Sequence, residues 1–170
     1  MRRIVNPFIK GESLEYKCFG CSPYNKIGLH LEFYEDEDFI ISEWYPHWQF
    51  EGYVNVLHGG IQTTLLDEIA SWAVYVKCKT AGVTSSLSVR YRKPVFLSDG
   101  KITIKARLDS INRRIATIKA WIENSHGDVM AEADIAYYLF SEKEAAEKYN
   151  YPGYDEFFKE ELIDQNNANQ

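Results

Sequence analysis

Hydrophobic and polar residues recur with two different periods along this chain. Between residues 59 and 78 apolar side chains return every three to four positions, which predicts one long helix. Apolar positions cover much of its circumference, so we expect the helix to be largely buried. A polar stripe remains, made of Gly60, Thr63, Thr64, Asp67 and Ser71. This spacing places Asp67 two turns from Gly60 on nearly the same face.

Elsewhere the apolar positions alternate with a period of two, which indicates strands. Before the helix, residues 27–33 and 39–45 are predicted to form a hairpin around an acidic turn at 34–38. The segment 46–57 contains Pro46 and Gly52 and is expected to be irregular. After Gly82 we predict four more strands, at 83–92, 101–109, 113–123 and 128–140. The predicted order is two strands, one buried helix and four strands.

The C-terminal region is predicted to hold a short helix at 141–149, because Ser141 and Glu144 fit a capping box. The polar residues at the very end, 165–170, are predicted to be disordered. The sequence shows neither an internal repeat nor a second domain. We therefore expect residues 1–170 to form one domain.

Composition and charge exclude several classes of function. The net charge of −6 argues against general nucleic-acid binding. No apolar run approaches the roughly 20 residues that a membrane span needs. The N-terminus has no long apolar segment, so we expect no signal peptide. Three cysteines give little support to a secreted disulfide scaffold, and a reducing cytoplasm is the expected location.

The tripeptide His58-Gly59-Gly60 lies directly before the predicted helix and is the strongest candidate for chemistry. Glycines there let the backbone approach a ligand closely, because they have no Cβ. Free N–H groups and the positive end of the helix dipole favour developing negative charge. A thioester carbonyl that becomes an oxyanion needs such donors. A carboxylate on the same helix, Asp67, could attack or activate water.

Three segments of the sequence together resemble the hotdog-fold acyl-CoA thioesterases of the phenylacetate-pathway and 4-hydroxybenzoyl-CoA type. They are 18–29, which contains Cys18-Phe19-Gly20-Cys21, then 52–68, and finally Val89-Arg90-Tyr91 with Pro94. The resemblance covers roughly residues 18–140. It implies an α+β hotdog fold, in which an antiparallel sheet wraps one central helix. It also implies hydrolysis of an acyl- or aryl-CoA thioester, with sites at the interface of a homodimer or a dimer of dimers, and we expect no cofactor.

By position, the resemblance implies that Asp67 is the catalytic carboxylate. It also implies that the amide of Gly60, together with that of Gly59, polarises the thioester carbonyl at the start of the helix. Thr84 lies where some members place a hydroxyl that holds the attacking water. An ordinary interface carboxylate is the alternative for Asp67.

The same resemblance implies that His58 orients the substrate or the attacking water. A hydrogen bond to loop backbone is its alternative role. Some members carry an asparagine six residues before this histidine, where this chain has Gly52. Asn55 is the nearest substitute for positioning water.

Two basic clusters are candidates for the coenzyme A phosphates. Arg90 and Arg92, with Lys93, form the first, and Arg113 with its neighbour forms the second. The alternative for both is a strand edge protected by charge. Four aromatic residues before the helix could line an acyl pocket or pack against the sheet or a second subunit, namely Trp44, Trp48, Phe50 and Tyr53.

Cys18 and Cys21 form a CxxC motif whose role stays open. A zinc site needs about four ligands, and no second CxxC or HxxxH completes one. A redox motif would normally precede a thioredoxin-like helix. A structural turn is therefore our interpretation, and no metal is expected. Glu68 lies among apolar helix positions, so we expect specific hydrogen bonds or a partner to hold it.

The sequence therefore predicts an acyl-CoA thioesterase, with three alternatives. A hotdog dehydratase or hydratase would use other motifs that we do not find. A non-catalytic acyl-CoA binding or sensing module would not need Asp67 near the thioester. An oligomerising domain without a ligand is the third. A panel of acyl-CoAs, followed by thiol detection, separates them.

Overall fold

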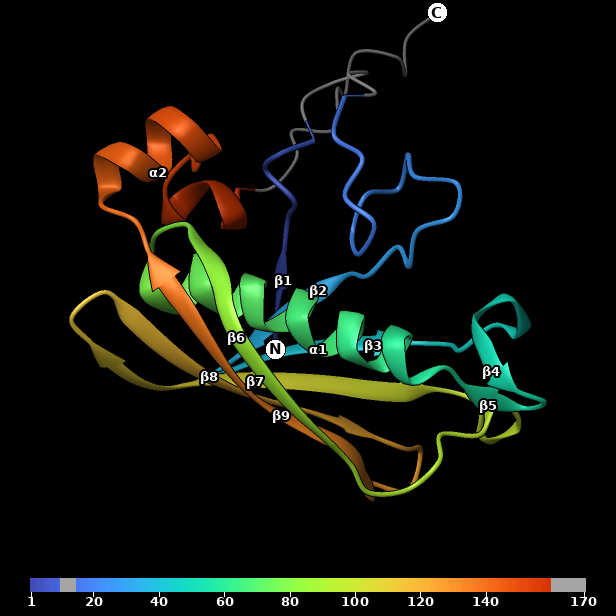
Figure 1. The fold of residues 1–170 in the computed structure, drawn as a ribbon. Helices are drawn as coiled ribbons and strands as arrows, with labels where there is room; N and C mark the ends of the chain where they lie inside the picture. Colours follow the sequence, from blue (N-terminus) through green and yellow to red (C-terminus); the bar gives the residue numbers. More distant parts are fainter. Residues whose placement is uncertain (10–14, 160–170) are drawn as a thin grey trace, which may run out of the picture.

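A computed structural model describes residues 1–9 and 15–159. Its centre is one long helix, α1 (Gly59–Ala73), which continues as a π-helical turn over Val74–Cys78. An antiparallel sheet of seven strands curls around this helix (Figure 1). The strands are β1 (Arg2–Ile4), β2 (Phe33–Asp36), β3 (Phe39–Trp44), β6 (Gly82–Tyr91), β7 (Ile102–Asn112), β8 (Ile115–Glu123) and β9 (Val129–Leu139). This is the hotdog fold predicted from the sequence.

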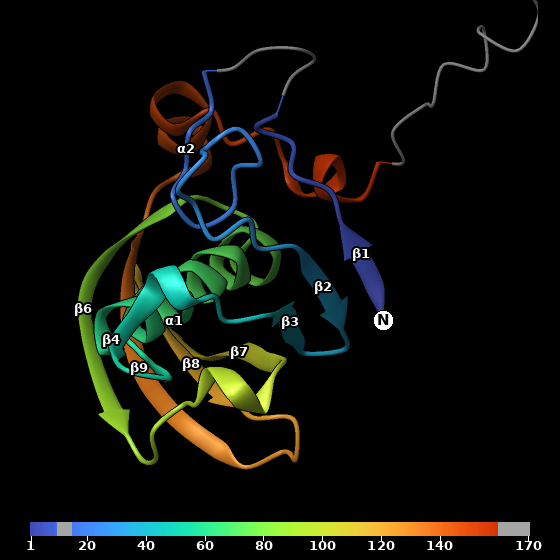
Figure 2. The same cartoon turned by 90° about the vertical axis from the view of Figure 1, so that its right-hand side faces the viewer.

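The order of strands across the sheet is β1-β2-β3-β7-β8-β9-β6, so β1 and β6 form its two edges. Seen at right angles to the first view, β6 and β1 lie on opposite sides of the helix (Figure 2). A separate hairpin of β4 (Glu51–Tyr53) and β5 (Val56–Leu57) precedes α1. Helix α2 (Glu142–Tyr149) follows β9, and 3-10 turns lie at Trp48–Phe50, Leu97–Asp99 and Tyr154–Phe158.

The core forms where α1 meets the concave face of the sheet. Leu65, Leu66 and Ile69 of the helix are completely buried. The inner positions of the sheet alternate with exposed ones, as the period of two predicts, and Ile104 and Ile118 face the helix side without exposure. Burial on this scale is the main stabilising term of the fold. It also fixes which face of α1 remains for chemistry.

The N-terminal hairpin differs from the prediction. Residues 27–32 are not a strand, although Leu29 and Leu31 are buried as the alternation required. Their amides donate to the carbonyls of Phe19 and Gly20 instead of to a neighbouring strand. His30 has a φ of 53°, which breaks an extended strand. The predicted turn at 34–38 is also too long, because β2 continues to Asp36 and pairs with β3.

Other predictions agree more closely. The helix at 59–78 and the four later strands are confirmed, with ends shifted by up to three residues. The segment 46–57, expected to be irregular, contains the β4–β5 hairpin. Strand β1 was not predicted, because three residues carry too little periodicity. The prediction of disorder for 165–170 lies outside the described residues.

Helix α2 begins with the predicted capping box. The Ser141 hydroxyl accepts from the Glu144 amide, and the Glu144 carboxylate accepts from the Ser141 amide. We expect Ser141→Ala to destabilise the protein by about 1 kcal/mol, the usual cost of losing such a cap. Urea denaturation of the two proteins measures this difference. If the substitution left the free energy of unfolding unchanged, helix α2 would not be part of the structure that unfolds cooperatively.

Candidate active site

Asp67 of α1 is held by two hydroxyl groups from neighbouring strands. The Thr84 hydroxyl of β6 and the Tyr137 hydroxyl of β9 each donate to Asp67 Oδ1 at 2.8 Å. Tyr137 also lies 2.8 Å from the Asp67 carbonyl oxygen. Within the described residues, Oδ2 has no hydrogen-bond partner. One carboxylate oxygen is therefore fixed, and the other is available to a ligand.

The pairing of β6 with β9 explains this arrangement. Thr84 and Tyr137 face each other directly in the register of the two strands. A register shift follows between Thr84 and Ser86, so a bulge changes the phase of β6. Because of this change, Thr84 and the later residue Tyr91 both reach the helix. The strand thus contacts α1 at two separate points.

Tyr137 was not predicted as a site residue. Burial, together with the nearby Asp67 carboxylate, raises the pKa of Tyr137 above its ordinary value. Its hydroxyl therefore stays protonated and donates to the carboxylate. The available signal was its inward position in the alternating segment 128–140, since a buried tyrosine hydroxyl usually needs a partner.

His58 caps the start of α1. Its Nδ1 accepts the Gly60 amide at 2.9 Å, so this ring nitrogen is unprotonated. The Gly60 amide, predicted to polarise the thioester carbonyl, is thereby engaged by the histidine. Within the described part of the chain the Gly59 amide has no such partner, and it is the free donor of the pair. At Gly52 an added Cβ would lie 3.2 Å from His58 Cδ2, so glycine lets the hairpin approach the ring.

A groove of about 700 Å³ lies at the start of α1. On one side the Tyr91 hydroxyl donates to the Gly59 carbonyl at 2.9 Å and lies 2.6 Å from Thr63 Oγ1. The groove is lined by Gly52, Tyr53, Val56, Leu57, His58, Gly59, Gln62, Tyr91, Arg92, Lys93 and Pro94. Asp67 is absent from this lining. Asp67 lies seven residues after Gly60, which corresponds to about 10 Å along the helix axis at 1.5 Å per residue.

The structure separates the predicted phosphate-binding residues. Arg92 lines the groove and forms an ion pair with Glu132 at 2.6 Å. Arg90 is exposed and lies 3.9 Å from the same carboxylate. Arg113 occupies the turn between β7 and β8, with a φ of 54°. That turn adjoins the C-terminal end of β9 and lies at the opposite end of the fold from the β4–β5 hairpin (Figure 1). Arg113 is absent from the lining of the groove.

Of Asn55 and the aromatic residues predicted near the site, only Tyr53 lines the groove. The Asn55 side chain is engaged with Ser98, donating to its hydroxyl at 3.0 Å and accepting its amide at 2.9 Å. It does not line the groove. Tyr53 does, and 83% of it is exposed. Trp44 is buried and packs against Phe50 instead.

Glu68 points away from the groove, toward the N-terminal segment. Its carboxylate accepts the Trp72 indole N–H at 3.1 Å and contacts the Cys18 thiol at 3.5 Å. This agrees with the expectation that specific hydrogen bonds hold this residue. Cys18 and Cys21 are free thiols in the described structure. Asp67, rather than Glu68, is thus the carboxylate on the side of β6.

Comparison with known proteins gives one family match. Residues 54–131 match the model of the thioesterase superfamily. No curated protein matches the sequence. None of the described helices is long and apolar enough to cross a membrane.

Several solved structures share the fold. The smu.793 protein of Streptococcus mutans, bound to acetyl-CoA, has a TM-score of 0.62 at 19% identity, covering 78% of this chain and 98% of that one. The Escherichia coli PaaI protein of the phenylacetic acid degradation operon has a TM-score of 0.61 at 19% identity, covering 67% and 82%. A hypothetical thioesterase of Streptococcus pneumoniae with coenzyme A has a TM-score of 0.60 at 22% identity, covering 66% and 90%.

The family match over residues 54–131 supports the predicted resemblance, and the structural neighbours confirm the predicted hotdog fold. The match begins at the hairpin before α1 and ends within β9, so it contains the helix start, Asp67 and Thr84. The chain carries the sequence signature of the thioesterase superfamily over residues 54–131, and it has the hotdog fold of that superfamily.

Proposed function

We propose that this protein hydrolyses the thioester of an acyl- or aryl-CoA to the free acid and CoA, as a homodimer or a dimer of dimers. The observation that carries the proposal is the Asp67 carboxylate. Thr84 and Tyr137 fix one of its oxygens, and the other has no partner within the described residues. A carboxylate held in this way suits a base or a nucleophile. The cytoplasmic location expected from the sequence stays a prediction.

A second chain would bring the two halves of the site together. In one chain Asp67 lies two turns from the groove at the helix start. Strand β6 is ten residues long, pairs with β9 on one side, and forms an edge of the sheet. Such an edge is suited to antiparallel pairing with an identical strand across a twofold axis.

Twofold pairing of β6 has a definite geometric consequence. Antiparallel pairing about the strand midpoint places the Gly82–Thr84 end of one chain opposite the Val89–Tyr91 end of its partner. Thr84 holds Asp67, whereas Tyr91 contacts the helix start at Gly59. The carboxylate of one chain would therefore lie beside the groove of the other. This supports a site shared between two subunits.

The chemistry of the proposed site follows from these groups. The thioester oxygen binds at the helix start, where the Gly59 amide and the helix dipole stabilise developing negative charge. The Asp67 carboxylate of the other chain activates water or attacks the carbonyl carbon. The tetrahedral intermediate then collapses and releases CoA as the thiolate. Where Asp67 is the nucleophile, this leaves a mixed anhydride on Asp67, which water hydrolyses to the free acid and the regenerated carboxylate. Because a thiolate is a good leaving group, the site does not need a strong general acid.

The groove also fits the charge of coenzyme A. Arg92 and Lys93 line it, and their carboxylate partners Glu132 and Asp128 come from β9 and from the turn before it. Phosphate oxygens could replace these partners, because exposed ion pairs contribute little stability. Two structural neighbours were solved with acetyl-CoA or coenzyme A, which supports this substrate class.

We expect Arg92→Gln to raise KM for acyl-CoA about tenfold and to leave kcat nearly unchanged. A charged hydrogen bond to phosphate is worth about 1.5–3 kcal/mol, and the lower end of this range corresponds to a change of about tenfold. The matched control is Arg107→Gln, an exposed arginine of β7 away from the groove. Steady-state kinetics on one acyl-CoA would measure both. Equal KM values for the two variants would exclude Arg92 from phosphate binding.

A panel of acyl-CoAs with thiol detection tests the proposed activity. We expect thiol release with at least one acyl class and no release from free CoA. Saturable binding of acyl-CoA without turnover would contradict the proposal and support a sensing module. Absence of both binding and turnover across aliphatic and aromatic thioesters would also contradict it.

A further inference from the structure

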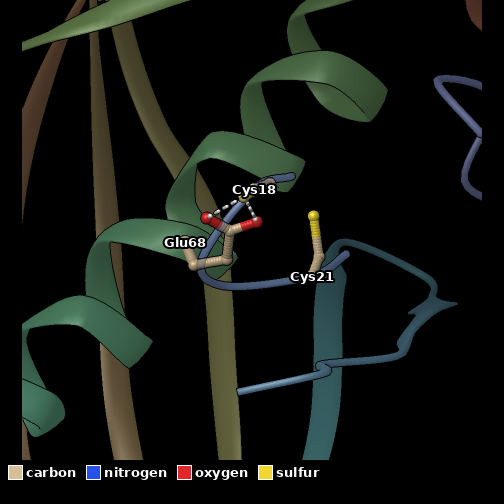
Figure 3. Close-up of side chains that lie close together, drawn as sticks. All are labelled: Cys18, Cys21 and Glu68. Carbon is tan, nitrogen blue, oxygen red and sulfur yellow. Dashed lines mark hydrogen bonds between the residues drawn. The ribbon is translucent and has the colours of Figure 1, made fainter. Parts of the chain in front are cut away.

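Two sulfurs and a carboxylate lie close together beside α1 (Figure 3). They belong to Cys18, Cys21 and Glu68, and their ligand atoms all lie within 4.8 Å of one another. Cys18 Sγ is 3.5 Å and 3.6 Å from the two oxygens of Glu68. Cys21 is buried, and the other two are half-buried. Since Glu68 points about 100° around the helix from Asp67, this cluster is distinct from the proposed active site.

We propose that this cluster binds one zinc-class divalent cation through Cys18 Sγ, Cys21 Sγ and a carboxylate oxygen of Glu68, with water as the fourth ligand. These donor types are the ones zinc prefers. Bonds of about 2.3 Å to sulfur and 2.0 Å to oxygen, in a tetrahedron, separate sulfur from oxygen by about 3.5 Å. The distances from Cys18 Sγ to the Glu68 oxygens match this separation.

Polar groups outside the cluster contact two of the three ligands. The Tyr16 hydroxyl lies 3.1 Å from Cys21 Sγ, and Asn6 Nδ2 donates to the same sulfur at 3.7 Å. The Trp72 indole N–H donates to Glu68 Oε1 at 3.1 Å. Donors of this kind orient metal ligands and stabilise their anionic forms. Cys21 and Glu68 are thus already positioned by groups outside the coordination shell.

Charge supports the same conclusion. Among the described residues, no lysine or arginine forms an ion pair with Glu68. A divalent cation would supply the positive charge that no lysine or arginine supplies to this carboxylate, and it would favour the ionised form of all three ligands.

The loop between the cysteines is shaped to admit Glu68. A Cβ at Gly20 would lie 2.3 Å from Glu68 Cδ, so only glycine leaves room for this carboxylate. Cys21 also lines a cavity of about 750 Å³, together with Asn6 and Trp72. This cavity offers a path for the ion and for its water ligand. A bound ion would fasten the segment around Cys18 to the helix that carries Asp67.

Metal analysis and cobalt spectroscopy on the full-length protein test this site. We expect one zinc ion per chain after loading with Zn²⁺ and removal of excess metal. Co²⁺ should give a tetrahedral spectrum with a thiolate-to-cobalt charge-transfer band. Cys18→Ser and Cys21→Ser should weaken Zn²⁺ binding and diminish this band. Glu68→Gln should lower the affinity for Zn²⁺, measured against a chromophoric chelator, by at least about tenfold.

Cys78→Ser is the matched control, because Cys78 is half-buried and lies outside the cluster. It should bind metal like the wild type. A wild-type protein in reducing buffer that takes up no Zn²⁺ and gives no charge-transfer band with Co²⁺ would overturn the proposal without any variant. A Cys18–Cys21 disulfide that re-forms after reduction, even with Zn²⁺ present, would overturn it in favour of a redox pair. An unchanged affinity in Glu68→Gln would remove the carboxylate from the ligand set.

Discussion

Replacing Asp67 by asparagine should lower kcat for acyl-CoA hydrolysis by about 10²–10⁴-fold, the range expected when a positioned acid–base group is lost. Asparagine has the same shape, and its side-chain oxygen can still accept from Thr84 and Tyr137. The fold should therefore survive while the basic and nucleophilic oxygen is lost. Thiol release under saturating acyl-CoA measures the effect.

Asp134→Asn provides the control for Asp67→Asn. Asp134 is an exposed aspartate of β9, away from the helix. Its substitution should leave kcat within about twofold of the wild type, because surface changes of this kind have small effects. Wild-type turnover by Asp67→Asn, in a protein with an unchanged melting temperature, would reject the catalytic role. Asp67 would then be an ordinary interface carboxylate.

Replacing Trp72 by alanine should lower the free energy of unfolding by about 3–5 kcal/mol. Trp72 is 1% exposed, and its ring stacks on Phe33 with centroids 4.3 Å apart. It also meets Phe157 edge to face and donates to Glu68. One side chain thus joins α1 to β2 and to the C-terminal 3-10 turn. Its removal leaves a cavity and takes one hydrogen-bond donor away from the Glu68 carboxylate.

Trp48→Ala is the control for this core substitution, since 67% of Trp48 is exposed. Its free energy of unfolding should change by no more than about 0.5 kcal/mol. Urea denaturation of both variants in the same buffer gives the comparison. Similar losses in the two proteins would show that the aromatic cluster around Trp72 is not a main source of stability.

The sequence predicted those parts of the fold whose signal is local. The period of α1 extends over twenty residues, and it correctly placed Asp67 on a polar face and Glu68 among apolar neighbours. Residues 27–32 show the limit of such patterns. Leu29 and Leu31 alternate because both side chains are buried, yet their amides bond to the preceding loop. Alternation reports burial and does not identify the hydrogen-bond partner.

The site was predictable only in part, because its contacts join distant positions. Tyr137 holds Asp67 across 70 residues, and no local pattern marks that pair. Asn55 was predicted because it is the asparagine nearest in sequence to position 52, but its side chain is engaged with Ser98, on a left-handed backbone at φ 62°. Arg113 was selected for its charge alone. The β7–β8 pairing then places it at the opposite end of the sheet from Arg92.

Mixed dimers test the central claim, that one chain supplies Asp67 to the groove of its partner. One chain would carry Asp67→Asn and the other Gly59→Leu, whose side chain would fill the groove beside Tyr91. Each parent homodimer should be inactive. Heterodimers isolated through two different tags should recover about half of wild-type activity, because one of their two sites is intact. A heterodimer no more active than its parents would contradict the shared site.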